Sequence, residues 1–360
     1  MRSGTAAFRV DASVQIGTGH VMRCLTLANA LRERGMHCLF ICRAHVGHLA
    51  EFIKAAGFDV CLLPVVDEFQ PSMNSDDYAL WLGCSQAEDA TQTQACLGAG
   101  CDWLVVDHYG LDASWERKLR GRARHILAID DLASRTHECE LLLDQNLGRI
   151  PKSYDGLLPF ESKRLIGTEF ALLRPEFAVW RAQSLAHRRQ SALQQLLVTL
   201  GGVDKDNMTG RVLSALVRGG LPPTCRVTVV MGASSPWLQA ITDQATNLPF
   251  ACEVKVDVRN MAELMANSDL AVGAAGSTAW ERCCLGLPSV ALVLAENQQA
   301  IAKALDNEGA AVMLPEPDSL PDAMSRLLDG GSLQTMSQLA SRLVDGHGCQ
   351  RVVAAMEMVE

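Results

Sequence analysis

The sequence predicts an α/β protein built from two Rossmann-like domains that face each other across a cleft. Short apolar segments alternate with helical patterns along most of the 360 residues, as parallel sheets with crossover helices require. This alternation stops near the middle of the chain and then starts again, which indicates two domains rather than one. A chain of this length is typical of two domains, each with a core of its own.

The first alternation predicts an N-terminal domain over residues 1–175. The strands expected in it are Phe8–Val10, Cys38–Cys42, Val60–Leu63, Trp103–Val106, Ile126–Ile129, Leu141–Leu143 and Arg164–Ile166. The residues that follow look irregular and end in a basic stretch, so we expect a linker at 176–190.

The second alternation predicts a C-terminal domain over residues 191–360. The strands expected in it are Gln195–Leu200, Val227–Met231, Cys252–Val256, Leu270–Gly273 and Val290–Leu294. The last helical pattern, Val352–Met356, fits either a terminal helix of this domain or one that crosses back to the first domain.

The charge balance and the cysteines limit the class of protein. Lys and Arg number 32 and Asp and Glu 41, and the resulting formal net charge of −9 disfavours nucleic acid as a partner. No apolar segment is long enough to span a membrane, and no secretory signal precedes the 13 cysteines. We therefore expect a cytoplasmic protein with reduced cysteines in its core, no membrane insertion and no metal.

The stretch VDASVQIGTGHVMRCLTLANALRERG reads as strand, turn and helix, with Gly35 ending the helix. The side chains expected on its buried stripe are Val21, Cys24, Leu25, Ala28 and Leu31. Gly17 and Gly19 permit a tight turn and let a ligand approach the backbone closely. His20 stands where the helix begins, and the positive end of the helix dipole favours a neutral imidazole that can accept a proton from water. A structural histidine is the competing interpretation, and the turn alone does not decide between them.

A second turn, in VTLGGVDKDN, offers donors for a diphosphate. Gly201 and Gly202 end a strand, and Asp206–Asn207 is suited to cap the next helix. Free N–H groups at this helix start could hold a diphosphate, although the lysine of a P-loop is missing.

A third turn, in GAAGSTAWERCCLGLP, has the same form. Gly276, Ser277 and Thr278 offer N–H and hydroxyl donors where a helix begins. Glu281 lies one turn inside that helix, either as an acceptor for two ribose hydroxyls or as a carboxylate that faces solvent.

Three strands of the first domain end in polar clusters, in the segments VVDHYG, IDDLA and LLLDQN. The residues concerned are Asp107, His108, Tyr109, Asp130, Asp131, Asp144, Gln145 and Asn146. Ligands of open α/β sheets lie at the carboxyl ends of the strands, so these clusters and His20 together indicate a rim that faces a ligand.

A known family contains the same segments in the same order: DASVQIGTGHVMRCLTLA, VVDHYG, IDDLA, LLLDQN, LLRPEF, VTLGGVDKDN and GAAGSTAWERCCLGLP. From about Phe8 to its C-terminus the sequence resembles the UDP-2,4-diacetamido-2,4,6-trideoxy-β-L-altropyranose hydrolases of pseudaminic acid biosynthesis. That family is similar in fold to the GT-B glycosyltransferases, so the resemblance implies a GT-B-like fold. It also implies hydrolysis of a small UDP-sugar without metal or cofactor, in a pathway that serves flagellin glycosylation.

The resemblance assigns roles to single residues. It implies that His20 is the catalytic base, that Tyr109 contacts the sugar, and that Asn297 lies near the sugar or its phosphates. It implies that Glu281 binds the ribose. The candidate substrate-binding residues are Gly17, Gly19, Asp107, Tyr109, Gly201, Gly202, Gly276, Ser277, Thr278, Glu281 and Asn297.

Three other classes of protein are compatible with these motifs. A glycosyltransferase of the same fold would use a sugar or lipid acceptor in place of water. A nucleotide-sugar-binding protein would bind without turnover, and an epimerase would yield a rearranged UDP-sugar or a pair of UDP and a glycal. Release of UDP with no acceptor present separates the hydrolase from the transferase and from the binding protein.

Overall fold

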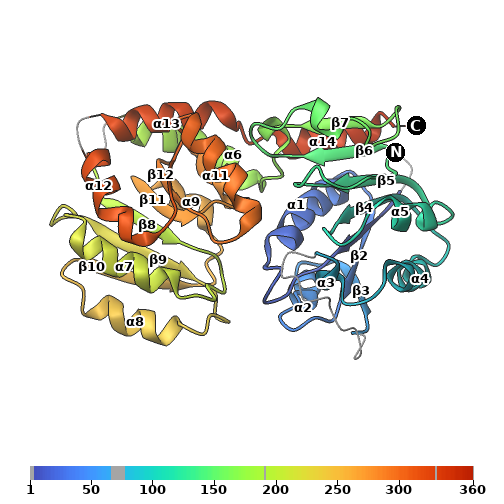
Figure 1. Ribbon diagram of the computed structural model, residues 1–360, viewed down its shortest axis with the longest axis horizontal. Coiled ribbons are helices and arrows are strands. Elements are labelled where there is room, and N and C mark those ends of the chain that lie inside the picture. Colours follow the sequence, from blue (N-terminus) through green and yellow to red (C-terminus); the bar gives the residue numbers. More distant parts are fainter. Residues whose placement is uncertain (1–3, 66–77, 190–191, 329–330, 360) are drawn as a thin grey trace. The chain divides into compact units, whose positions relative to one another are not determined.

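The computed structural model describes residues 4–65, 78–189, 192–328 and 331–359. The chain divides into two compact units. The first unit comprises the residues up to Leu172 and those from Gly348 onward, and the second comprises Leu173–His347. Each unit is a parallel sheet packed between helices, so the α/β class is the one that the sequence predicts (Figure 1).

The first unit contains a seven-stranded sheet in the order β3-β2-β1-β4-β5-β6-β7, with neighbouring strands parallel. Its strands are β1 Thr5–Val10, β2 His37–Arg43, β3 Asp59–Leu63, β4 Cys101–Asp107, β5 Ala123–Ile129, β6 Leu141–Asp144 and β7 Lys163–Ile166. Every strand expected here is present, and the central strands are those whose burial on both faces gives a continuous apolar run.

Helices cover both faces of this sheet. They are α1 Gly19–Glu33, α2 Ala50–Ala55, α3 Ala79–Leu82, α4 Gln86–Leu97, α5 Ala113–Leu119 and α14 Gly348–Glu357, with short 3-10 turns η1 Pro151–Tyr154 and η2 Thr168–Phe170. The expected stripe of α1 is buried in one core, together with α14, which lies beside α1 (Figure 1). Gly35 follows α1 with φ +83°, as expected. The helices α4 and α5 pack in a second core on the other face, around Trp115.

The second unit contains a six-stranded parallel sheet in the order β10-β9-β8-β11-β12-β13. Its strands are β8 Gln195–Thr199, β9 Arg226–Met231, β10 Ala251–Val256, β11 Leu270–Ala274, β12 Ser289–Leu292 and β13 Val312–Leu314. The sequence did not reveal β13, because an edge strand of three residues is too short to show a pattern.

The helices of the second unit run between these strands and after them. They are α6 Pro175–His187, α7 Met208–Arg218, α8 Leu238–Thr246, α9 Met261–Ala266, α10 Thr278–Cys284, α11 Gln299–Asn307, α12 Leu320–Leu328 and α13 Ser332–Leu343, with η3 Glu296–Gln298 and η4 Pro317–Ser319.

The expectation of an irregular linker at 176–190 is wrong for most of that segment. It forms α6, which belongs to the second unit, and Gln190 lies outside the described residues. Two of its arginines satisfy carbonyl groups at the ends of other helices, whereas Arg189 is exposed. Arg181 donates to the carbonyl groups of Cys284, Ser341 and Val344, and the buried Arg188 donates to carbonyl groups at the end of α9.

The expectation that the cysteines are reduced and lie in the core holds only for some of them. Cys61 on β3 and Cys96 on α4 form a disulfide, whereas both were expected to be reduced. The remaining eleven are free, and most of them are buried. Within the described segments, no helix combines the length and apolar character needed to cross a membrane.

Candidate active site

The first unit gathers a set of polar side chains where the carboxyl ends of β1 and β4 lie side by side. The chain leaves β1 for α1 on one face of the sheet and leaves β4 for α5 on the other face. Ligands of open α/β sheets bind at such a change of direction. His20 is the second residue of α1 and Asp107 the last residue of β4, so the fold itself brings the two together.

His20 and Asp107 form a hydrogen-bonded pair, with Nδ1 2.6 Å from Oδ1. Burial raises the pKa of the Asp107 carboxyl, but the Arg23 guanidinium and His20 outweigh this and hold that pKa well below its usual range. Because an ionised carboxylate can only accept, the network assigns the proton to Nδ1 and leaves the lone pair on Nε2. His20 can therefore act as a base through Nε2, with 11% of its side chain exposed.

Arg23 joins Asp107 to Asp131. Its Nε and Nη2 donate to the two Asp107 oxygens at 2.6 and 2.7 Å. Its Nη1 donates to Asp131 Oδ1 at 3.1 Å, and Nη2 lies 2.8 Å from Asp131 Oδ2. The planar fork of a guanidinium suits two carboxylates in this way. Arg23 follows His20 by three residues, so both lie on the same face of α1.

Asp131 also holds the phenol of Tyr109. Tyr109 Oη donates to Asp131 Oδ2 at 2.6 Å, and Asn146 Nδ2 donates to Oδ1 at 3.0 Å. Burial and the charge of Asp131 raise the pKa of Tyr109 well above its usual value, so the phenol stays neutral. The Tyr109 ring meets the His20 ring edge to face, with centroids 4.8 Å apart.

Five side chains thus form a closed ring of contacts, which we call the His20 ring. Its members are His20, Arg23, Asp107, Tyr109 and Asp131. They come from α1 and from the ends of β4 and β5, so each strand end contributes a carboxylate.

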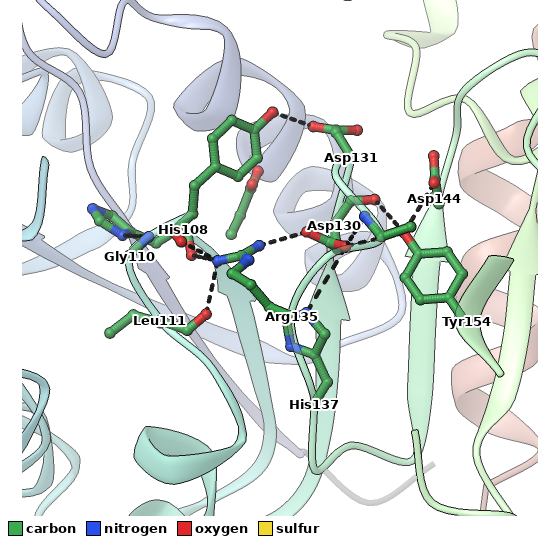
Figure 2. Close-up of polar contacts among 12 residues, drawn as sticks. His108, Gly110, Leu111, Asp130, Asp131, Arg135, His137, Asp144 and Tyr154 are labelled. Atoms are coloured by element: carbon green, nitrogen blue, oxygen red, sulfur yellow. Dashed lines mark hydrogen bonds and ion pairs between the residues drawn. The ribbon is translucent and has the colours of Figure 1, made fainter. Parts of the chain in front are cut away.

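A second polar cluster supports the loops next to the His20 ring. Arg135 donates to the carbonyl groups of Tyr109 and Leu111 and pairs with Asp130 (Figure 2). Tyr154 Oη lies 2.9 Å from Asp144 Oδ2 and 3.1 Å from Asp130 Oδ2. Burial and the charge of Asp131 raise the pKa of Asp144 to about 6.

Aromatic side chains border the ring on the side of α3. Trp81 stacks on Tyr109 with centroids 5.6 Å apart, and Tyr78 meets Tyr109 edge to face at 5.0 Å. Trp81 is half-buried, and sequence reasoning gave it no role.

The structure brings His20, Asp107 and Tyr109 together, as expected for residues of one site. Gly17 lies in the preceding turn with φ +77°, a conformation that favours glycine, whereas Gly19 begins α1 without a positive φ. Sequence reasoning missed Arg23 and named Asp131 only as part of the rim. The three-residue spacing of His20 and Arg23 was the signal that could have drawn attention to Arg23.

In the second unit, the start of α7 is less open to a diphosphate than expected. Asp204 accepts from the first two N–H groups of α7 at 2.8 and 2.9 Å, and Asn207 accepts from the third at 3.2 Å. The expectation of free N–H groups at this helix start is therefore wrong, because nearby side chains occupy them. Gly201 and Gly202 precede the helix, and their N–H groups donate to none of the described residues.

The turn between β11 and α10 keeps its donors available. The N–H groups of Gly276, Ser277 and Thr278 have no acceptor in the described part of the chain. Arg282, which is 1% exposed, donates to Thr278 Oγ1 at 3.2 Å and to the carbonyl of Ala274 at 2.8 Å. The Thr278 hydroxyl therefore accepts from Arg282 and keeps its own proton for another acceptor.

Glu281 and Asn297 lie on elements that flank this turn. Burial raises the pKa of Glu281 to about 7, and Arg174 Nη2 lies 3.9 Å from its Oε1. Asn297 is part of η3, and a Cβ placed on Gly276 would lie 3.7 Å from the neighbouring Gln298 Nε2. The structure thus brings η3 close to the turn that carries the free donors.

No group of three or more His, Cys, Asp or Glu side chains in the described segments is arranged to hold a metal ion.

Solved structures share this architecture over the full chain. MurG from Acinetobacter baumannii superposes with a TM-score of 0.67 at 16% sequence identity, and the match covers 99% of each chain. CalG4, the calicheamicin glycosyltransferase, superposes with a TM-score of 0.65 at 16% identity over 100% of both chains. The chain has the GT-B glycosyltransferase fold.

Sequence comparison gives a consistent result for this GT-B chain. Residues 222–343 match the glycosyltransferase family 28 C-terminal domain. The chain is 25% identical over 306 residues to a UDP-2,4-diacetamido-2,4,6-trideoxy-β-L-altropyranose hydrolase of Campylobacter jejuni, which covers 85% of this chain and 97% of that protein. It is 29% identical over 197 residues to the spore coat polysaccharide biosynthesis protein SpsG of Bacillus subtilis, which covers 53% of this chain and 57% of that protein. The resemblance expected from the motifs is confirmed.

Proposed function

We propose that this protein hydrolyses UDP-2,4-diacetamido-2,4,6-trideoxy-β-L-altropyranose to UDP and free 2,4-diacetamido-2,4,6-trideoxy-L-altrose, in the cytoplasm, as a step of pseudaminic acid biosynthesis. The His20–Asp107 pair carries the proposal, because it supplies a base held in one tautomer by a buried carboxylate. The substrate is suggested by the name of the Campylobacter jejuni relative, which the chain matches over nearly its whole length.

In this proposal the second unit binds the nucleotide. The diphosphate accepts from the N–H groups of Gly276, Ser277 and Thr278. It also accepts from the hydroxyl groups of Ser277 and Thr278. Glu281 accepts from the ribose hydroxyls, and Asn297 contacts the sugar or its phosphates. Gly201 and Gly202 offer two further N–H groups to the phosphates.

The first unit supplies the chemistry. His20 Nε2 takes a proton from a water molecule, whose oxygen attacks the anomeric carbon from the face opposite UDP. The bond from that carbon to the β-phosphate oxygen breaks, and its electron pair leaves with UDP, so the configuration is inverted. Asp107 stabilises the imidazolium that forms, and Tyr109 contacts the sugar. Donors of the β11–α10 turn stabilise the charge gathering on the diphosphate, so we propose that no metal or cofactor takes part.

A glycosyltransferase is the second candidate, and the match of residues 222–343 to a glycosyltransferase domain favours it. In that case His20 would remove a proton from a hydroxyl of an acceptor rather than from water. The fold alone serves both reactions.

Phosphorus and proton NMR together separate the two candidates. The protein is incubated with the UDP-linked sugar, with EDTA and without any acceptor. We expect UDP and the free sugar in equal amounts. A substrate that stays intact while the folded protein binds UDP would contradict the hydrolase, and would point to a transferase or to a binding protein.

A further inference from the structure

We infer that Asp131 is a positioning residue for this hydrolysis, acting on His20 through Arg23 and on the substrate through Tyr109. The inference rests on the proposed function and deepens it. It starts from the His20 ring, in which Asp131 is the carboxylate farthest from His20 along the hydrogen-bonded contacts.

Asp131 accepts three hydrogen bonds and forms an ion pair with Arg23. It takes two contacts from Arg23, at 3.1 and 2.8 Å, one from Tyr109 at 2.6 Å and one from Asn146 at 3.0 Å. Its side chain is 12% exposed. A carboxylate with this many donors has one orientation, and it fixes the groups that bind to it.

The charge of Asp131 matters for the proton transfer. Burial raises the pKa of Asp131, but the Arg23 guanidinium outweighs this and keeps the carboxyl ionised. The His20 ring then holds two carboxylates and one guanidinium, so it becomes neutral only when His20 has taken the proton of water. The neighbouring Arg149 is paired with Asp144 at 2.9 Å and leaves this balance unchanged. The charge of Asp131 therefore favours the transition state over the ground state.

Asp131 also determines whether the Tyr109 hydroxyl acts toward the sugar as a hydrogen-bond donor or as an acceptor. The phenol proton points to Asp131 Oδ2, a group that can only accept, so the Tyr109 oxygen faces any ligand as an acceptor. It will select a substrate group that donates, and the N–H of an acetamido substituent is such a group. Tyr109 thereby becomes a specificity determinant whose polarity is set by Asp131.

Two variants and their combination test this inference, namely Asp131→Asn, Tyr109→Phe and the double variant. Tyr154→Phe is the matched control, because Tyr154 contacts Asp130 and Asp144 but no member of the His20 ring. We expect each of the first two to lower kcat by about ten-fold or more, and Tyr154→Phe to change it less than about two-fold. We expect the double variant to lose about ten-fold less than the product of the single losses, as coupled residues do. Losses that multiply, or an equal loss in Tyr154→Phe, would overturn the inference.

A measurement that needs no turnover separates this inference from the proposed function. In protein labelled with nitrogen-15 in histidine, the His20 Nδ1–H should give a strongly downfield proton resonance. We expect Asp131→Asn to shift it and Tyr154→Phe to leave it in place. A resonance unmoved by Asp131→Asn would show that Asp131 does not act on His20, even in an active enzyme. A wild type that releases no UDP but shows the expected shift would defeat the proposed function and leave the geometry intact.

Discussion

The two units differ in how polar groups are arranged at the carboxyl ends of their strands. The comparison is between the ends of β1 and β4 in the first unit and the end of β11 in the second. In the first unit the His20 ring pairs buried charges with one another, so that each side chain is held by its neighbours. In the second unit the β11–α10 turn presents backbone N–H groups with no acceptor among the described residues. Paired charges hold a reactive group in one orientation, whereas unpaired donors are suited to receive an anion. This difference is the basis on which we propose that one unit carries the chemistry and the other binds the nucleotide.

Replacing His20 tests the chemical side of this comparison and has the largest expected effect. His20→Ala should lower kcat by about 10²–10⁴-fold, the usual contribution of a general base, with the affinity for UDP unchanged. Steady-state kinetics and titration calorimetry measure the two quantities. His37→Ala is the control, because His37 also pairs with an aspartate, Asp59 at 2.9 Å, but on the surface. Turnover at the wild-type rate in His20→Ala would remove His20 from the mechanism.

Replacing Thr278 tests the binding side. Thr278→Val keeps the shape of the side chain and removes its hydroxyl, so the affinity for UDP should fall about ten-fold, as for one hydrogen bond to a charged group. Calorimetry with uridine supplies the comparison, because a nucleoside without phosphates should bind both forms equally. Equal losses for UDP and uridine would mean that the hydroxyl supports the fold and not the diphosphate.

The pH dependence of UDP binding tests the role of Glu281 in holding the ribose. We expect the affinity for UDP to change by a few-fold. The pKa of Glu281 is raised to about 7 in the unliganded protein, and only the ionised carboxylate offers both of its oxygens as acceptors to two ribose hydroxyls. The affinity for UDP should therefore rise as the pH increases through about 7. The Glu281→Gln variant should lack this part of the rise, while titration of UDP itself contributes equally to both proteins. Identical pH profiles would place Glu281 outside the ribose site.

Asp144 gives an effect on the stability of the first unit and none that we expect on turnover. Its pKa is raised to about 6, so the folded state binds a proton more tightly than the unfolded chain does. Its stabilising contribution is complete below about pH 4, near the usual aspartate pKa, and is lost as the pH rises through about 6. The free energy of unfolding should therefore fall further in the wild type than in Asp144→Asn over this range. Urea titrations at several pH values measure the difference, and parallel curves would contradict the assignment.

Much of the fold could be predicted from the sequence, because buried parallel strands and amphipathic helices leave clear patterns. The edge strand β13 was too short to do so, and α6 was hidden by arginines that bind carbonyl groups rather than water. The disulfide of Cys61 and Cys96 joins a strand and a helix whose pairing no local pattern reveals.

Several side chains of the candidate site were named from the sequence, but Arg23 and the arrangement of the side chains were not. The motifs pointed to His20, Asp107 and Tyr109, which the structure brings together. The bond between Arg23 and Asp131 joins residues more than a hundred positions apart, and only the order of the strands makes it possible. The capping of α7 by Asp204 depends on local backbone geometry, with Asp204 at φ +46°, which residue types alone did not show.

Hydrolysis in water enriched in oxygen-18 tests the central claim most directly. If His20 activates water to attack the anomeric carbon, phosphorus NMR will show UDP with an unlabelled β-phosphate. Proton NMR at early times will show the inverted anomer of the free sugar. Label on the β-phosphate of UDP, or a first product with retained configuration, would contradict attack by water on the carbon opposite UDP.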